Sequence, residues 1–552
     1  MDEGLILKYV LQNAVRYNGK ANPGAIIGKV LQEKPELRAE IERVSSYINI
    51  IVKDVNTMTL EQQKEKLGMV APELLQMVEM KHDKEERKIP ELKNVHKGVV
   101  MRFAPNPNGP MSIGHCRQAL WNWFFVQKYK GCYILRFDDT DPGKKYPIKE
   151  AYGWFKEDLR FLGVKPGKVV VQSKRLKIYY KYSERLLKEG NAYVCCCGVE
   201  EFRKLRNKQM ECPCRNLPAE MQMERWKKMF KGYKAGGAVV RVKTNIMHNN
   251  PAVRDWPAFR IIDKSKHPLD KKTKVWPLLN FASAIDDYEF KVTHILRGID
   301  LKISDERQKY IYSYFGWVYP ETMYSGKLLF SGIKSTSEAR KLISEGKLTG
   351  WDDPRLGTVK ALRRRGIQKE AIINFIKDVG ITPADTQISF DKLAAYNKEA
   401  IDKKANRYFA VFKPYKIKIE HAPEMVAKIP LHPGNPRKGF RVLKPGGEFY
   451  LQDKLEDDCN YRLMHLFNFR NKKFISKDVD KNLNAKMLHW LPAGKGLAKI
   501  KAVMDDNGVK EGLAEPGIKK VKLNEMVQLE RNFYCRLDKK TPGMMVFYYC
   551  HD

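Results

Sequence analysis

The sequence predicts a multidomain α/β protein in which a doubly wound, Rossmann-type sheet follows an N-terminal helical domain and precedes C-terminal β-barrels. Three observations carry this prediction. First, apolar residues recur at helical spacing over residues 1–80. Second, the pattern over residues 99–138 is that of a strand, a glycine-rich turn, a helix and a second strand. Third, short runs of alternating apolar and polar residues, with Pro-Gly pairs, follow residue 405. The 552 residues are enough for about three or four domains of ordinary size.

The first domain is expected to span residues 1–96 and to be helical. Its periodic apolar positions begin with Leu5 and Tyr9, and a break at Asn22-Pro23-Gly24 separates two helical stretches. A tract rich in both signs of charge follows and is typical of a solvated linker. This tract places the domain boundary near Lys97.

The nucleotide-binding core is expected over residues 97–310. We expect a buried strand over 99–105, a helix over 113–131, a second strand over 132–141 that ends in carboxylates, an insertion over about 165–275, a strand over 291–298 and a helix over 304–317. Gly131, at the end of the first of these helices, is expected to be its C′ residue. Ligands of such a sheet bind at the carboxyl ends of its strands.

The composition is strongly basic. Lys plus Arg number 102 against 65 Asp plus Glu, so the formal net charge is +37, and the excess is interpreted as spread along the chain. A polyanionic partner, most simply nucleic acid, is favoured over a merely solvated basic surface. No run approaches the 18 apolar residues that a membrane span needs, and no signal peptide is recognised, so a cytoplasmic protein that binds no membrane is expected.

The turn PNPNGP leads into the helix that begins near Gly114. The unpaired backbone N–H groups at a helix start carry the positive end of the helix dipole and form a phosphate site. Small residues at Gly109, Ser112 and Gly114 let a nucleotide approach the backbone, and His115 can donate a hydrogen bond to a phosphate or ribose oxygen. By itself, the pattern is explained equally well by a structural histidine at a loop-to-helix junction.

Five of the ten cysteines lie between residues 195 and 214. Cys195, Cys197, Cys212 and Cys214 form two Cys-x-Cys pairs, which suit a tetrahedral structural Zn²⁺ site. Reduced thiols, or a relic site without metal, are the alternative. Such clustering is typical of a reducing compartment.

Several stretches match one family together. They are RFAPNPNGPMSIGH, LRFDDTDP, NPAVRDWPAFR, VTHILRGIDL, KSTSEAR and GWDDPRLGTVKALRRRGI. With them the chain resembles the class I aminoacyl-tRNA synthetases of the glutamyl/glutaminyl group, and VQLERNFYCRLD resembles the archaeal glutamyl branch in particular. The similarity covers essentially the whole chain.

The resemblance implies a domain plan. It makes 97–310 the class I catalytic domain with an acceptor-stem insertion at about 165–275, 311–404 a signature-loop and stem-contact domain, and 405–552 the anticodon-binding barrels. The zinc site at 195–214 would fold the insertion. Arg363, Arg364 and Arg365 are expected to contact tRNA phosphates, although a solvated helix face is the simpler interpretation.

The resemblance also implies the residues that handle ATP with its Mg²⁺. Catalytic roles are expected for Ser112, His115, Lys334 and Arg340, and ATP contacts for Gly109, Ser112, Gly114, His115, Lys334, Ser335 and Thr336. Two residues depart from the family pattern. Ser112 replaces the first histidine of the signature, and Glu338 stands where a cation is usual, so Lys334 or Arg340 is expected to supply that charge.

The amino-acid site follows from the chemistry of carboxylates. A guanidinium fork matches the two oxygens of a carboxylate. The resemblance assigns the substrate's side-chain carboxylate to Arg102 and Arg297 and its α-amino group to Asp138, with Ala104 and Asn106 as further contacts.

The implied reaction is activation of L-glutamate with ATP to glutamyl-adenylate, followed by transfer to the 3′ end of tRNA(Glu). A monomer is expected. Three alternatives stay open: a glutamine-specific enzyme of the same class, an enzyme that also charges tRNA(Gln), and a non-catalytic RNA-binding or assembly protein. The last is motivated by Ser112 and Glu338.

Overall fold

The computed structural model describes residues 3–17, 19–75, 89–96, 98–330 and 335–552. It divides into two compact units, Met1–Pro90 and Glu91–Asp552. The sequence placed the first boundary a few residues later, after residue 96. Each unit is described by itself.

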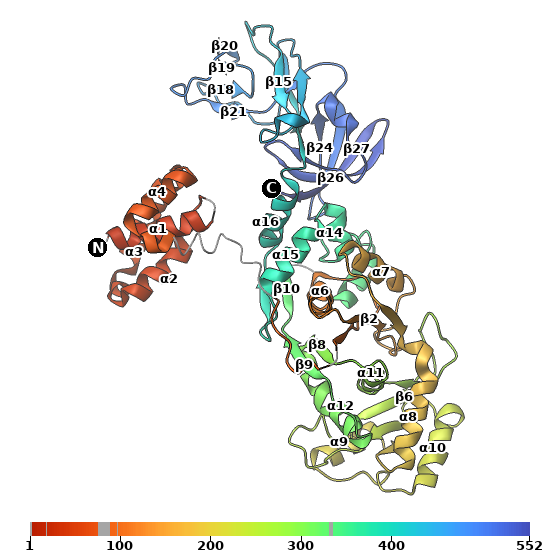
Figure 1. Ribbon diagram of the computed structural model, residues 1–552. Coiled ribbons are helices and arrows are strands. Elements are labelled where there is room, and N and C mark those ends of the chain that lie inside the picture. The colour runs from red at the N-terminus through yellow and green to blue at the C-terminus, as the bar shows by residue number, and fades with distance from the viewer. Residues whose placement is uncertain (1–2, 18, 76–88, 97, 331–334) are drawn as a thin grey trace. The chain divides into compact units, whose positions relative to one another are not determined.

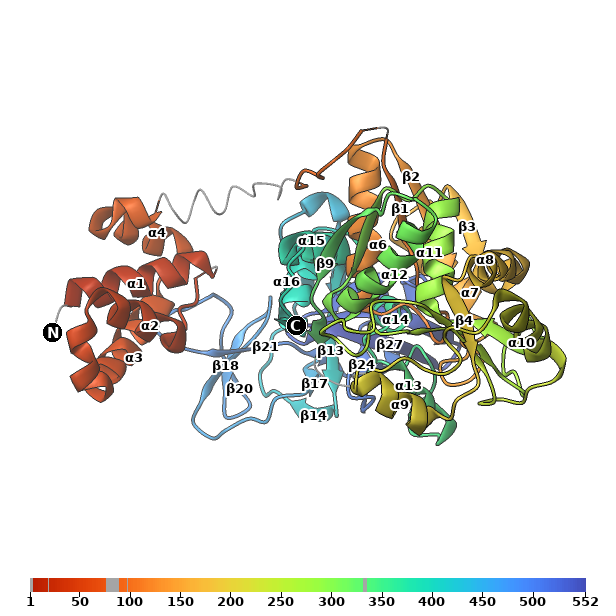
Figure 2. The ribbon, with the colours of Figure 1, turned by 90° about the horizontal axis from the view of Figure 1, so that it is seen from below.

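The first unit is helical, as predicted. Its helices are α1 (Glu3–Arg16), α2 (Pro23–Glu33), α3 (Ile41–Thr57) and α4 (Leu60–Val70), with a 3₁₀ turn at Pro35–Glu40. Figure 2 shows these helices packed on one another. Leu11, Ile26, Ile48 and Leu67, one from each helix, are fully buried in a common core.

A parallel five-stranded sheet forms the core of the second unit. Its strands are β1 (Val100–Phe103), β2 (Cys132–Phe137), β3 (Lys168–Val171), β8 (His294–Gly298) and β9 (Glu321–Ser325), in the order β3-β2-β1-β8-β9. Its helices are α6 (Ile113–Lys128), α7 (Ala151–Phe161), α11 (Leu279–Glu289) and α12 (Lys302–Tyr314), and α6 contacts β1, β2 and β8 (Figure 1). This is the predicted doubly wound sheet. Its strand order reverses between β1 and β8, where a crevice is expected.

The end of helix α6 differs from the prediction for Gly131. The residue with left-handed backbone is Lys130, with φ of 48°, and Gly131 follows it and donates its N–H to the carbonyl oxygen of Val126 at 2.8 Å. A Cβ on Gly131 would overlap the carbonyl oxygen of Val99. The glycine is required here because the backbone of β1 passes close by.

The insertion is an antiparallel four-stranded sheet with helices. Its elements are α8 (Leu176–Lys188), β4 (Ala192–Cys195), α9 (Val199–Asn207), α10 (Ala219–Lys231), β5 (Val239–Val242), β6 (Pro257–Ile261) and β7 (Val275–Pro277), with a 3₁₀ turn at Gln172–Arg175. Trp226, Trp256 and Trp276 are nearly completely buried in its core.

A mainly helical segment follows the parallel sheet. It contains β10 (Leu328–Phe330), α13 (Thr336–Ser344), α14 (Val359–Arg365), α15 (Lys369–Val379), β11 (Thr386–Ile388) and α16 (Phe390–Ile401), and a 3₁₀ turn at Ile299–Leu301 precedes α12. Helices α15 and α16 pack on each other, and α15 packs on α6.

The C-terminal region is built from β-strands, as predicted. They are β12 (Asn406–Tyr408), β13 (Ala410–Phe412), β14 (Tyr415–Lys418), β15 (Ala427–Pro430), β16 (Phe440–Leu443), β17 (Glu448–Leu451), β18 (Asn460–Leu463), β19 (Asn468–Arg470), β20 (Lys473–Ser476), β21 (Lys486–Leu488), β22 (Leu491–Pro492), β23 (Ala498–Val503), β24 (Val509–Ala514), β25 (Met526–Leu529), β26 (Phe533–Thr541) and β27 (Met544–His551), with 3₁₀ turns at Pro436–Lys438 and Pro516–Lys520. The largest sheet has the order β12-β25-β26-β27-β23-β24-β13. Its two edge strands are separated in the chain only by Phe409, so the sheet curls nearly into a barrel.

Candidate active site

A cavity of about 450 Å³ lies at the carboxyl ends of β1 and β8. Its lining includes all five residues predicted to contact the amino acid: Arg102, Ala104, Asn106, Asp138 and Arg297. It also includes Arg260, Asp141 and Lys145, which the sequence analysis did not single out. Of the residues predicted to bind ATP, those that the structure describes do not line this cavity.

Buried ion pairs hold the charged groups of the cavity. The Nε atom of Arg102 donates to Oδ1 of Asp287 at 3.1 Å, and Nη1 of Arg136 donates to the same oxygen at 2.6 Å. Arg136 also donates through Nε to Oδ1 of Asp138 at 2.7 Å. Desolvation lowers the pKa of Arg102 and raises that of Asp138, because burial disfavours both charged forms.

Arg297 is fixed from the side of helix α12. Its Nη1 atom donates to Oδ1 of Asp305 at 2.5 Å, and its Nη2 atom donates to Oε1 of Gln308 at 3.1 Å. The hydroxyl of Tyr319 donates to the same two acceptors at 3.0 and 2.8 Å. The Nε atom of Arg297 and Oδ1 of Asn106 are buried without a hydrogen-bond partner in the described part of the chain, which leaves polar atoms at this cavity unsatisfied.

Ser112 and His115 are joined at the start of α6. Ser112 is the N-cap residue, with extended backbone, and its N–H donates to Nδ1 of His115 at 3.1 Å. The Ser112 hydroxyl lies 3.0 Å from the same nitrogen. Because Nδ1 accepts a hydrogen bond, the proton of the neutral ring is on Nε2. The ring makes edge contacts with Phe103 and Phe155, and desolvation lowers the pKa of His115 to about 4.

The turn before α6 lies against helix α13. A Cβ on Gly109 would overlap the methyl group of Thr336, so this glycine permits the close approach. Ser335 caps α13, with its hydroxyl accepting from the N–H of Glu338 at 3.1 Å. Gly114 is the second residue of α6. Lys334 lies outside the described residues.

Arg340 joins helix α13 to the turn. Its Nη2 atom donates to the carbonyl oxygens of Asn108 at 2.6 Å and Tyr146 at 3.3 Å, and its guanidinium lies 4.4 Å from the centre of the Tyr146 ring. The structure therefore gives this arginine contacts that hold two backbone segments together.

The arginine run of α14 is placed differently from the expectation of tRNA contacts. Arg364 donates to Asp352 at 3.1 Å and to Asp538 at 3.2 Å, and the buried Arg365 donates to the carbonyl oxygen of Cys550 at 2.9 Å. These two arginines join α14 to the C-terminal sheet. Arg363 stays partly exposed, with its Nη1 atom 3.4 Å from Oδ1 of Asp158.

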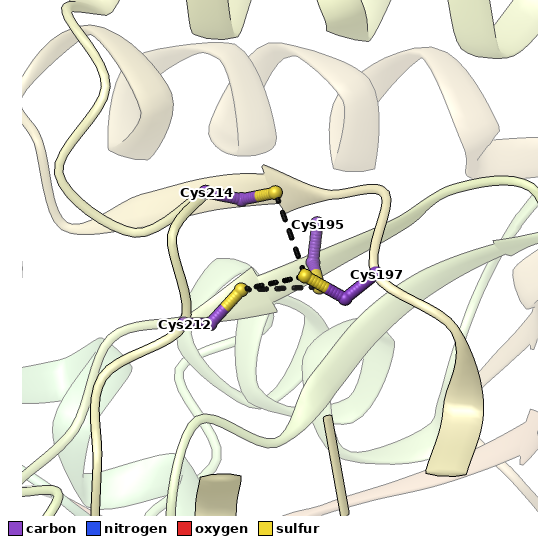
Figure 3. Close-up of side chains that lie close together, drawn as sticks. All are labelled: Cys195, Cys197, Cys212 and Cys214. Carbon is purple, nitrogen blue, oxygen red and sulfur yellow. Dashed lines mark hydrogen bonds between the residues drawn. The ribbon is translucent and has the colours of Figure 1, made fainter. Parts of the chain in front are cut away.

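The four predicted cysteine ligands come together. The Sγ atom of Cys212 lies 3.6 Å from that of Cys195 and 3.3 Å from that of Cys197, and the Sγ atoms of Cys197 and Cys214 lie 3.9 Å apart (Figure 3). All four sulfurs lie within 4.8 Å of one another. The hydrogen bond from Cys212, with the nearby Arg241 guanidinium, lowers the pKa of Cys195 to about 5.

The basic charge is unevenly distributed, contrary to the interpretation that it is spread along the chain. Residues 1–90 contain 14 Lys or Arg and 14 Asp or Glu. Residues 165–275 contain 27 basic and 10 acidic side chains, and residues 405–552 contain 28 and 17. The excess is therefore densest in the insertion, whereas residues 405–552 carry about the average density of the whole chain. None of the described helices has the length and apolar character that crossing a membrane requires.

Sequence reasoning missed Asp287, Arg136 and Asp305. Arg136 and Asp138 are two residues apart, and side chains at this spacing lie on the same face of a strand, so their contact could have been expected. The pairing of Asp287 with Arg102 joins residues 185 positions apart, and no local pattern reports it.

Comparison with known proteins places the chain in a family. The family models described as tRNA synthetases class I (E and Q), catalytic domain, and tRNA synthetases class I (E and Q), anti-codon binding domain, match residues 98–403 and 405–488. The glutamate–tRNA ligase of Pyrococcus furiosus is 47% identical over 569 residues, covering 100% of this chain and 99% of that protein. That of Methanocaldococcus jannaschii is 45% identical over 562 residues, covering 100% of both.

A crystal structure of a glutamate tRNA ligase from Elizabethkingia meningosepticum is 22% identical, covers 56% of this chain and 71% of that chain, and superposes with a TM-score of 0.42. The catalytic-domain model covers the parallel sheet and the cavity of this chain, and the anticodon-binding model covers the first part of its β-stranded C-terminal region. The chain belongs to the class I tRNA synthetases of the E and Q group.

Proposed function

We propose that this protein is a glutamate–tRNA ligase, which activates L-glutamate with ATP to glutamyl-adenylate and transfers the glutamyl group to the 3′ end of tRNA(Glu). The observation that carries the proposal is the match over the full chain to relatives that are named for this activity. The reaction needs positioned substrates and stabilised phosphate charge, and no side chain has to form a covalent bond.

The cavity is the proposed glutamate site. The guanidinium of Arg102 binds the side-chain carboxylate, with Arg297 beside it, and Asp138 accepts from the α-ammonium group. Ala104 and Asn106, which also line the cavity, are proposed as further contacts of the substrate. Support comes from the position of these five residues around one cavity at the carboxyl ends of the strands.

ATP, bound with Mg²⁺, is proposed to lie along the start of α6. Gly109, Ser112, Gly114 and His115 form the phosphate-binding turn, and Ser335 and Thr336, at the start of α13, lie beside it. Lys334, which precedes them in the chain, is proposed as a further ATP contact. His115 is neutral at physiological pH, because its pKa is lowered to about 4, so it acts as an Nε2–H donor and not as a cation. Arg340, whose guanidinium is bound to two carbonyl oxygens, orders the turn.

The tRNA is proposed to contact the two basic regions of the second unit. The insertion and residues 405–552 hold most of the excess of Lys and Arg, and phosphate contacts from such side chains supply most sequence-independent affinity for nucleic acid. The excess of basic side chains does not determine whether the enzyme also aminoacylates tRNA(Gln), because anticodon discrimination depends on a few side chains of the barrels.

A structural Zn²⁺ ion is proposed at Cys195, Cys197, Cys212 and Cys214. Ligands at about 2.3 Å from a tetrahedral zinc are about 3.8 Å from one another. Three of the six sulfur separations, at 3.3 to 3.9 Å, lie near this value, and all six are within 4.8 Å. The four thiolates would hold the ion and fold the insertion around it, and the ion has no part in the reaction.

Pyrophosphate exchange with L-glutamate or L-glutamine, and charging of purified tRNA(Glu) and tRNA(Gln), test the function. Glutamate-dependent exchange and charging of tRNA(Glu) are expected of the chain, which we propose to act as a monomer. Exchange with glutamine alone would assign the enzyme to the glutamine-specific class. The absence of exchange with either amino acid, with tRNA present, would favour the non-catalytic alternative.

The assignment of Arg102 has its own test. Arg102→Ala is expected to raise the KM for glutamate far more than the KM for ATP, because only glutamate loses a bidentate partner. Equal increases of both constants would contradict the assignment.

A further inference from the structure

Four charged side chains form a continuous chain beneath the cavity. Arg102 contacts Asp287 at 3.1 Å, Asp287 contacts Arg136 at 2.6 Å, and Arg136 contacts Asp138 at 2.7 Å. The signs of charge alternate along it. The two end members line the cavity, and Arg136 and Asp287 lie behind them.

The inner members are almost completely shielded from water. The side chains of Arg136 and Asp287 are each 1% exposed, and those of Arg102 and Asp138 are 7% exposed. Both guanidinium contacts of Asp287 are made through Oδ1, and its Oδ2 atom is buried without a hydrogen-bond partner among the described residues. A single carboxylate oxygen therefore fixes two arginines that arrive from neighbouring strands, β1 and β2.

We propose that Asp287 is a positioning residue that sets the separation between the two ends of the glutamate site. It holds the guanidinium of Arg102, which binds the side-chain carboxylate, and through Arg136 it holds Asp138, which binds the α-ammonium group. This inference rests on the proposed function. Asp287 itself does not line the cavity.

The physical reason is the length of the substrate. A site that holds both ends of a flexible amino acid binds it well only if the two groups are held at a fixed distance. Without the carboxylate, the hydrogen bond that Arg102 keeps among the described residues is the one to the carbonyl oxygen of Leu296, at 3.4 Å from Nη1, and the guanidinium can turn away. Asp138 is then the carboxylate that stays hydrogen-bonded to Arg136, with Asp286 acting on Arg136 through its charge, and Asp138 becomes less available to the α-ammonium group.

Asp287→Asn is the direct test in the full chain. It is expected to raise the KM for L-glutamate in pyrophosphate exchange by about tenfold or more and to leave the KM for ATP within about twofold. A merely structural role would lower the melting temperature or the amount of active enzyme without this split between the two constants.

The adjacent residue provides a matched control. Asp286 is on the same helix and equally buried, but it contacts Arg175, Tyr179 and Gln172, none of which lines the cavity. Asp286→Asn is expected to lower the melting temperature and to leave the KM for glutamate unchanged. An equal increase of that constant in both variants would overturn the proposal.

A variant that keeps the charge covers the case in which Asp287→Asn does not fold. Asp287→Glu retains a partner for both buried arginines but moves the carboxylate by one methylene, so it is expected to raise the KM for glutamate and not that for ATP. Binding of glutamate as in the wild type would overturn the proposal. A wild type without glutamate-dependent exchange would instead overturn the proposed function.

Discussion

The backbone N–H of Ser112 donates a hydrogen bond to Nδ1 of His115, three residues ahead in helix α6. This contact closes the first turn of the helix, since a side chain at the third helical position often accepts from the N-cap residue. It also fixes the tautomer, so that the Nε2–H of the ring is the remaining donor. Ser112 therefore orients the imidazole of His115. This role of Ser112 does not depend on a direct contact between its hydroxyl and a phosphate.

Substitution of the two residues is expected to have unequal effects on adenylate formation. Ser112→Ala removes one neutral hydroxyl but keeps the backbone donor at 3.1 Å, so a loss of about 1 kcal/mol, or about fivefold in rate, is expected. His115→Ala removes a donor to the phosphates and is expected to slow the reaction by about 10²- to 10³-fold. Pyrophosphate exchange at saturating substrates measures both, and an unchanged rate in His115→Ala would refute the phosphate site.

The lowered pKa of His115 predicts a pH dependence of stability. In the unfolded chain a histidine takes up a proton below its usual pKa of 6.5, whereas in the folded protein His115 does so only near 4. The unfolded state therefore binds more protons between these values, and stability is lost as the pH falls through this window.

His115→Gln provides the comparison, because glutamine does not titrate and is a common partner of an N-cap residue. Melting temperatures at pH 7, 5.5 and 4.5 are expected to fall less in this variant than in the wild type. Parallel curves for the two proteins would show that His115 titrates normally.

The cysteine cluster predicts one zinc ion per chain. Metal analysis of the purified protein is expected to give close to one equivalent, and Cys212→Ser with Cys214→Ser is expected to lose it and to destabilise the insertion, because a structural zinc site contributes directly to folding. Cys196 is the matched control: it lies in the same segment but not in the group of four, and Cys196→Ser should retain the metal. A wild type with well under one equivalent contradicts the assignment.

The first unit is predicted to contribute little to the electrostatic affinity for tRNA. It contains as many acidic as basic side chains, whereas the rest of the chain holds the entire excess of +37. Each phosphate contact adds about 0.7 to 0.9 to the slope of log K against log salt. A chain that starts at Glu91 is expected to keep the slope of the full protein within about one contact. A fall equivalent to several contacts would show that the helices bind RNA.

The elements with strong local signals could be predicted from the sequence. Helix α6 and strands β1 and β2 lie where the spacing of apolar residues predicts them. The turn between β1 and α6 was recognised from its prolines and glycines. Gly131 was assigned to the wrong position of the helix end, because the constraint on it comes from the carbonyl oxygen of Val99, which belongs to another element.

The difference between local signals and contacts with distant residues also explains which residues of the site could be predicted. Five of the residues that line the cavity were predicted because they match motifs, and motifs contain residues close together in the chain. Asp287 and the inward contacts of Arg364 were missed, because their partners are distant in sequence and a charged side chain carries no local sign of the pair it forms. Charge alone predicts solvent exposure for Arg365, and only its packing against Phe390 and two carbonyl oxygens reverses that expectation.

The contacts of α14 also restrict how this chain can be recombined. This seven-residue helix is bound to the turn before α6 by the N–H of Val359, which donates to the carbonyl oxygen of Met111 at 2.8 Å, and to the C-terminal sheet by Arg364 and Arg365. The carboxylate of Asp538 is a side-chain acceptor and depends on the residue at that position, whereas the acceptors of Arg365 are backbone carbonyl oxygens of β27 that any residue supplies. A chimera that exchanges residues 405–552 with those of a relative therefore has to keep a carboxylate at position 538 or bring the helix of the same parent, because otherwise Arg364 loses that acceptor. The two family models meet at residue 404, but side-chain contacts continue across this boundary, so the two parts of the chain do not pack as separate domains there.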